Sequence, residues 1–277
     1  MTMAGGPVAI GGIGGSGTRV VAALLQRLGH HIGSDLNQAL DNLWFTLLFK
    51  RRDILLETSR DLAWLCEQFW LRMSGVPALD ATSVDRIARL AATGRAQHDA
   101  AWLGQRLQSW QDAPPRAGGP WGWKEPNSHI LIDRMFDLRP DLRYIHVLRN
   151  PLDMALSRNQ NQLNLWGPVL LDRPITAGPR DSLSYGCAVA RRIRRILDDH
   201  PGRVCLIDFE QLCSDPQVAA RQVADFVGAP LDEACLRWFS DLVAHGAPAI
   251  GRHKCIPPDI FAPDDLHFVT TLGYVTE

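Results

Sequence analysis

The chain has 277 residues, enough for one large α/β domain or two smaller ones. Hydrophobic residues make up 46% of the chain and charged residues 21%, an ordinary balance for a globular protein. The formal net charge of −1 gives no electrostatic reason to expect binding to DNA or to an acidic membrane. No apolar run approaches the roughly 18 residues of a membrane span, and the N-terminus has no signal-peptide pattern. We therefore expect a cytoplasmic protein.

The cysteine pattern indicates reduced thiols and no metal site. The six cysteines are scattered and never form a CxxC pair, so neither a disulfide framework nor a zinc site is expected: Cys66, Cys187, Cys205, Cys213, Cys235 and Cys255. Scattered thiols of this kind are typical of a cytoplasmic protein.

The first half of the chain opens as strand, loop and helix. Residues 7–11 predict a short buried strand, and residues 19–28 predict a helix that ends at Gly29. Residues 40–112 are mostly helical in pattern, and residues 113–120 predict a loop by composition.

The second half alternates between strands and helices. Residues 121–129 lead into a helix that ends near Leu138. The remaining expected elements are a strand over 142–148, a helix from 152 to 162, an irregular loop over 167–182, a helix over 183–199, a strand over 204–207, a helix over 215–227 and a mostly irregular segment from 246 to 277. The loop is a candidate substrate lid, with bounds of about 160–182. The alternation predicts a parallel sheet covered on both faces.

The glycine-rich segment Ile10–Arg19 (IGGIGGSGTR) predicts a phosphate-binding loop. Glycines let backbone N–H groups converge on an anion, and the N-terminus of the following helix adds partial positive charge. Ser16 and Thr18 offer hydroxyl groups, and Arg19 offers a full charge.

Three nucleotide classes fit this loop to different degrees. Gly12, Gly14 and Gly17 match the dinucleotide fingerprint GxGxxG, with Asp35 18 residues beyond, but residues 30–35 are poor strand material. A Walker A loop is disfavoured because Thr18 stands where its lysine belongs. A metal-free loop for a nucleotide 5′-phosphate fits best, and a glycine turn without a ligand is the remaining interpretation.

A second candidate anion site follows the strand over residues 142–148. Arg149 comes at the carboxyl end of that strand, which is the ligand-binding edge of an open parallel sheet. Ser157 lies eight residues later, on the expected next helix, where it can fold back toward the same anion. Two anion sites after two parallel strands favour the third interpretation.

At this point the chain resembles the PAPS-dependent sulfotransferases, in particular their bacterial members. The resemblance rests on six segments in family order: SGTR (16–19), WKEP (123–126), VLRNPLDMALS (147–157), IDFEQLCSDP (207–216), GRHK (251–254) and LGY (272–274). It implies a single domain over residues 1–277, with a P-loop-like α/β/α core, a parallel sheet of about four or five strands and a helical insertion on the acceptor side. It also implies PAPS as the sulfuryl donor and no metal.

The resemblance also implies roles for particular residues. The loop residues Gly14, Gly15, Ser16, Gly17, Thr18 and Arg19 would hold the 5′-phosphosulfate. Arg149 and Ser157 would hold the 3′-phosphate, with Arg252 and Lys254 as further candidates.

The catalytic residues follow less directly. The family places a lysine or arginine just before SGT, where this chain has Gly15, so Arg19 or Lys124 must supply the cation at the leaving phosphate. The alternative role of Lys124 is a surface ion pair with Glu125. Asp41 is the favoured general base, ahead of Asp35, and the other candidates are Glu125 and His129.

The acceptor itself is not readable from the sequence. A hydroxyl or amine of a small molecule, carbohydrate or peptide is expected, with a pocket formed by residues 40–112 and 160–182 and an aromatic lining from Trp44, Phe45 and Trp166. The arginines over 191–195 form either a solvated helix face or a site for an anionic acceptor. Two other functions stay open: an NAD(P)-binding oxidoreductase, and a nucleotide-binding protein without catalysis.

Overall fold

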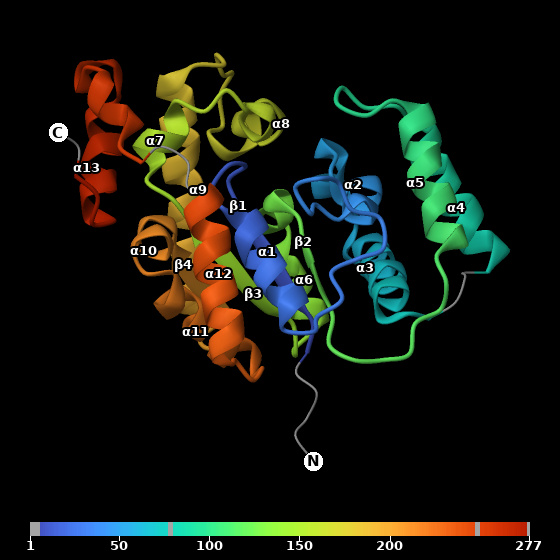
Figure 1. Cartoon of the computed structure of the whole chain (residues 1–277). Coiled ribbons are helices and arrows are strands. Elements are labelled where there is room, and N and C mark those ends of the chain that lie inside the picture. The colour runs from blue at the N-terminus through green and yellow to red at the C-terminus, as the bar shows by residue number, and fades with distance from the viewer. Residues whose placement is uncertain (1–5, 77–79, 247–249, 276–277) are drawn as a thin grey trace.

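A four-stranded parallel sheet forms the centre of the computed structural model, which describes residues 6–76, 80–246 and 250–275 (Figure 1). The strands are β1 (Val8–Gly12), β2 (Gly122–Lys124), β3 (Arg143–Leu148) and β4 (Val204–Asp208), in the order β2-β1-β3-β4. All three strand pairs are parallel, so the carboxyl ends of the strands meet at one edge.

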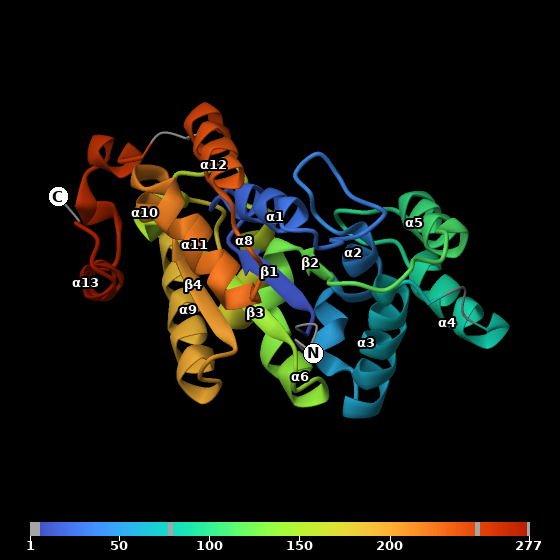
Figure 2. The same ribbon diagram turned by 60° about the horizontal axis from the view of Figure 1, so that its bottom comes forward.

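Side chains that alternate along the strands feed two separate hydrophobic cores. Val8 and Ile10 of β1 face one core, with helices α1 (Thr18–Arg27), α11 (Pro216–Val227) and α12 (Glu233–Gly246). Ala9 faces the other core, with α2 (Leu43–Phe49), α3 (Ser59–Ser74), α6 (Ile132–Leu138) and α9 (Pro179–Asp199). Figure 2 shows α1, α11 and α12 on one side of the sheet and α6 and α9 on the other. The expected three-layer α/β/α architecture and the strand number are confirmed.

The helices connect the strands and also build a lateral extension. Their bounds are α1 Thr18–Arg27, α2 Leu43–Phe49, α3 Ser59–Ser74, α4 Ala81–Ala92, α5 Ala100–Asp112, α6 Ile132–Leu138, α7 Pro151–Ala155, α8 Asn161–Leu170, α9 Pro179–Asp199, α10 Phe209–Ser214, α11 Pro216–Val227, α12 Glu233–Gly246 and α13 Pro263–Thr271. Short 3₁₀ turns are η1 Arg52–Leu56, η2 Pro126–Ile130, η3 Arg252–Cys255 and η4 Pro258–Ile260. Helices α3, α4 and α5 lie at one end of the molecule, away from α13 (Figure 1). Within the described ranges, none of these helices is long and apolar enough to cross a membrane.

Several expected elements differ from the structure. The loop expected over 167–182 is shortened, because α8 runs to Leu170 and α9 starts at Pro179. Leu163 and Trp166, three residues apart, bury one face of α8, and this burial outweighs the glycine and proline content of the segment. Ser157 lies just beyond the short helix α7, not two turns into a helix. The segment after residue 246 also contains α13.

Candidate functional site

The glycine-rich segment forms a turn between β1 and α1. Gly15 and Gly17 adopt φ values of 98° and 91°, the left-handed region that favours glycine. Helix α1 begins at Thr18 with no side-chain cap and no acidic residue in its first turn. The Oγ of Ser16 is buried and has no hydrogen-bond partner within the described chain. An uncapped helix N-terminus beside a buried, unpartnered hydroxyl is suited to an anion.

Helix α8 braces this loop through one glutamine. The Gly14 N–H donates to Oε1 of Gln162 at 2.6 Å, and Nε2 of Gln162 donates to the Gly12 carbonyl at 3.2 Å. The amide of Gly14 is therefore already engaged, unlike the Ser16 hydroxyl. Gln162 is not predictable from the sequence, because no spacing links it to the loop 148 residues earlier.

Arg149 extends from the end of β3 to the same loop. Its Nη1 donates to the Gly15 carbonyl at 3.1 Å, and its guanidinium lies 4.7 Å from the centre of the Phe209 ring. Ser157 is also close, because a Cβ built on Gly15 would lie 4.0 Å from the Ser157 Oγ. The structure thus brings the loop, Arg149 and Ser157 together.

Asp153 joins Arg149 to the late segment 251–253. Its fully buried carboxylate accepts the Gly251 N–H at 2.7 Å and the His253 N–H at 3.1 Å, and it contacts Nδ1 of His253 at 2.7 Å. The same carboxylate lies 3.6 Å from Nη2 of Arg149. Burial alone would raise the pKa of Asp153, but the hydrogen bonds from His253 and Gly251 outweigh it and lower that pKa. In the sequence, the only indication of this ion pair is the spacing of four residues between Arg149 and Asp153.

The two late cationic candidates differ in position. Nη2 of Arg252 donates to the Asp153 carbonyl at 2.8 Å, and its Nε is buried without a partner in the described chain. Arg252 also lowers the pKa of Arg149, after the larger effect of burial, so the two guanidinium groups are neighbours. Lys254 is exposed.

Lys124 and Asp41 meet at the edge of the sheet. Lys124 ends β2 in register with Ile10 of β1, and its buried ammonium forms an ion pair with Asp41 and donates to the Ala39 carbonyl at 3.1 Å. The Asn42 N–H donates to the Lys124 carbonyl at 2.7 Å, which fixes Asp41 beside the lysine. The alternative of a surface pair between Lys124 and Glu125 is wrong.

Glu125 instead points to a different lysine. Its carboxylate is buried, accepts hydrogen bonds from the Asn127 N–H at 2.5 Å and Nδ2 at 2.8 Å, and lies 3.6 Å from Nζ of Lys50. Burial raises the pKa of Glu125. Lys50 is not predictable from the sequence, because no motif surrounds it.

The remaining catalytic candidates have other partners or none. Asp35 accepts from Nη1 of Arg106 at 3.3 Å and from the Ser109 hydroxyl. His129 is buried, its ring nitrogens contact the Pro126 carbonyl at 2.8 Å and the Tyr185 hydroxyl at 3.2 Å, and burial lowers its pKa to about 4. Arg19 is exposed on the first turn of α1.

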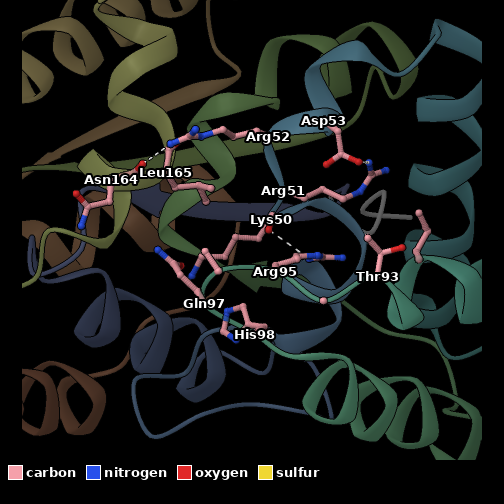
Figure 3. Close-up of a pocket in the computed structure, with 13 residues that line it drawn as sticks. Lys50, Arg51, Arg52, Asp53, Thr93, Arg95, Gln97, His98, Asn164 and Leu165 are labelled. Atoms are coloured by element: carbon pink, nitrogen blue, oxygen red, sulfur yellow. Dashed lines mark hydrogen bonds and ion pairs between the residues drawn. The ribbon is translucent and has the colours of Figure 1, made fainter. Parts of the chain in front are cut away.

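Two neighbouring cavities lie between the sheet edge and the helical extension. One cavity, of about 510 Å³, is lined by Asp41. The second, of about 420 Å³, lies between η1, the 93–98 segment and α8 (Figure 3). Both are lined by Lys50 and His98. Trp44, Phe45 and Trp166 are all packed in the core and line neither cavity, so the expected aromatic lining is not found in these two cavities.

The arginine cluster on α9 has structural partners. Arg192 pairs with Asp133 at 2.6 Å, Arg191 lies 3.6 Å from Asp265, and Arg194 donates to the Thr271 carbonyl at 2.8 Å. These contacts fasten α9 to α6 and α13, so they argue against a site for an anionic acceptor there.

The dinucleotide interpretation of the loop lacks its second strand. In the structure, His31 forms only an isolated bridge with Trp121, and no strand leads to Asp35. Across the described ranges, no group of three or more potential metal ligands occurs.

The sequence model of the sulfotransferase family matches residues 7–233, and the chain belongs to this family. A search among curated proteins finds no match. Similar solved structures include sulfotransferase STF9 from Mycobacterium avium (19% identical, covering 90% of this chain and 70% of that chain, TM-score 0.45). Others are the sulfotransferase domain of the Synechococcus PCC 7002 olefin synthase (16%, 98% and 96%, 0.48) and a sulfotransferase from Alicyclobacillus acidocaldarius (16%, 96% and 95%, 0.44). At these scores the family assignment rests on the match of the family model.

Proposed function

We propose that this protein transfers a sulfuryl group from PAPS to a hydroxyl or amine of an acceptor in the cytoplasm. The observation that carries the proposal is that two candidate anion-binding elements meet, namely the uncapped α1 with the Ser16 hydroxyl, which has no partner in the described ranges, and the buried Arg149. Two separate phosphate sites suit a nucleotide with a 5′-phosphosulfate and a 3′-phosphate.

In the proposed reaction the acceptor oxygen or nitrogen forms a bond to sulfur while the bond from sulfur to the 5′-phosphate oxygen breaks, and adenosine 3′,5′-bisphosphate leaves. Residues 14–19 would hold the 5′ end, whereas Arg149, Ser157 and Arg252 would hold the 3′-phosphate, with Lys254 as an outer contact. Lys124, assisted by Arg19, would stabilise the charge on the leaving phosphate. Asp41 would accept the acceptor's proton, because it lines the 510 Å³ cavity beside Lys124.

Replacing Arg149 tests the assignment of the nucleotide. Arg149→Ala removes a bidentate donor, so we expect the affinity for adenosine 3′,5′-bisphosphate to fall by at least about 100-fold in isothermal titration calorimetry. Arg237→Ala, at an exposed position on α12, is the matched control and should bind like the wild type. Unchanged affinity in Arg149→Ala overturns the proposal.

Two further measurements separate the alternatives. Fluorescence titration with NADH should show no binding, whereas an oxidoreductase would bind it. Incubation with labelled PAPS and a broad acceptor panel should give a labelled product, which a nucleotide-binding protein without catalysis would not form.

A further inference from the structure

The cavity of about 420 Å³ has an unusual charge balance. Its walls carry four cationic side chains, Lys50, Arg51, Arg52 and Arg95, and a single carboxylate, Asp53. Figure 3 shows these side chains around the cavity, with Arg52 against Asn164 and Leu165 of α8. Arg51 is neutralised, because it pairs with Asp53 at 2.6 Å and with Glu57 at 2.5 Å. Nζ of Lys50 lies 3.6 Å from the Glu125 carboxylate, so the excess of positive charge rests on Arg52 and Arg95.

Arg52 and Arg95 satisfy their hydrogen bonds without a counterion. Arg52 donates to the carbonyls of Leu165 at 2.7 Å and Asn164 at 2.6 Å. Arg95 donates to the carbonyls of Thr46 and Leu47 at 2.6 Å each. Carbonyl dipoles orient a guanidinium group but carry no net charge, so both groups keep their positive charge in the cavity wall.

The titration behaviour of the wall agrees with this excess of positive charge. Burial, followed by the charge of Arg51, lowers the pKa of Arg95 to about 10. Burial, followed by the charges of Lys50 and Arg95, lowers the pKa of His98 to about 4. His98 is therefore neutral at physiological pH, and its Nε2 is buried without a hydrogen-bond partner in the described chain.

The position of the cavity relates it to the acceptor rather than to the nucleotide. Lys50 and His98 also line the neighbouring cavity that contains Asp41, and Nζ of Lys50 lies 3.6 Å from Glu125 at the sheet edge. On its other side, α8 supplies Asn164 and Leu165 to the cavity and Gln162 to the phosphate loop. The cavity therefore shares its wall with the cavity of the candidate base Asp41, and its lining contains none of the candidate phosphate-binding residues.

We propose that this cavity binds the acceptor through an anionic group, a carboxylate or a phosphate, held by Arg52 and Lys50, so that the sulfuryl acceptor is itself an anion. The inference rests on the proposed sulfuryl transfer. The exposed, planar guanidinium of Arg52 and the partly buried ammonium of Lys50 both line the cavity and provide the donors that such a group requires. Arg95, also in the cavity wall, adds to the positive electrostatic potential that attracts such an anion.

The test compares ligands of one shape and different charge on protein saturated with adenosine 3′,5′-bisphosphate, which fills the phosphate sites. Saturation-transfer NMR titrations would use benzoate and phenyl phosphate as anionic probes and benzamide as the neutral probe. We expect at least one anion to bind about tenfold more tightly than benzamide. This preference should fall below about threefold in Arg52→Gln and persist in Arg52→Lys and in the distant control Arg237→Gln.

Equal affinity for all three probes, no binding of either anion, or an unchanged preference in Arg52→Gln overturns the inference. If Arg52→Gln unfolds, as judged by circular dichroism, Lys50→Gln replaces it under the same criteria. Failure of adenosine 3′,5′-bisphosphate to bind would overturn the proposed function instead, and the preference for anions would then be measured without it.

Discussion

At the scale of single residues, the contacts of Asp153 indicate that it positions neighbouring protein groups and does not itself bind substrate. Its carboxylate faces Arg149, at the end of β3 four residues earlier, and two backbone N–H groups of the segment 251–253, about 100 residues later in the chain. A buried carboxylate with this many donors fixes the position of the groups around it. Arg149 and Arg252 are therefore held as one unit by a residue that has no assigned contact with substrate.

We expect Asp153→Asn to weaken both folding and nucleotide binding. An amide cannot accept from all of these donors, so the free energy of unfolding should fall by about 1–3 kcal/mol. The affinity for adenosine 3′,5′-bisphosphate should fall by about tenfold or more. Adding Arg149→Lys to the Asp153→Asn variant keeps the positive charge at position 149 but should not restore the affinity. Chemical denaturation and calorimetry measure the two effects.

Asp198→Asn, at an exposed position on α9, is the matched control and should alter neither quantity. Wild-type affinity in Asp153→Asn would show that Asp153 acts only in folding.

At the scale of elements, the junction between the phosphate loop and α1 depends on Gly17. Its φ of 91° disfavours any side chain, and a Cβ at this position would lie 2.5 Å from the Phe209 ring. Phe209 in turn lies under the guanidinium of Arg149. The first residue of α10 therefore packs against both candidate phosphate-binding segments.

Gly17→Ala should lower the free energy of unfolding by at least about 2 kcal/mol, because backbone strain and the overlap with Phe209 add together. Gly104 offers a control of the opposite sign, since it lies inside α5 with no atom within 4 Å of an added Cβ. Gly104→Ala should raise the free energy of unfolding by about 0.5–1 kcal/mol. Urea denaturation measures both, and equal stability of the two variants would contradict this account.

The sequence predicts elements whose signals are local and misses those that depend on distant partners. Strands β1, β3 and β4 are buried apolar runs, and each was placed to within one or two residues. Strand β2 is only three residues long, and its pairing with β1 defines it, so the sequence indicated only a lead into a helix. Helix α8 was missed because its glycine and proline are offset by burial of Leu163 and Trp166.

The candidate site divides in the same way. The glycine loop and Arg149 were identified from strand-to-helix junctions, which the sequence shows directly. Gln162 and Lys50 act across the fold and have no local pattern.

At the scale of the whole molecule, buried histidines link stability to pH. Burial lowers the pKa of His129 to about 4 and that of His146 to about 3, against an ordinary value near 6.5. Between those values the unfolded chain binds protons that the folded chain does not, so stability must fall as the pH falls. Each histidine contributes a loss of up to about 1.4 kcal/mol per pH unit below about pH 6.

Urea denaturation at pH values stepped from about 7 to about 5 tests this dependence. His146→Gln keeps an acceptor for the Tyr144 hydroxyl, which contacts Nδ1 of His146 at 2.8 Å, and should remove one histidine's share of the slope. His267→Gln, at an exposed position on α13, should leave the slope unchanged. A wild-type stability that is flat across this range would contradict the burial of neutral histidines.

The link from Asp153 to the segment 251–253 also has a consequence for the order in which the protein is made. All four strands of the described sheet have been synthesised by residue 208, and the phosphate loop precedes three of them. The backbone groups that complete the surroundings of Arg149 are added more than forty residues later. A nascent chain can therefore complete its sheet while its proposed nucleotide site is unfinished, and it gains that site only after residue 253 has been synthesised.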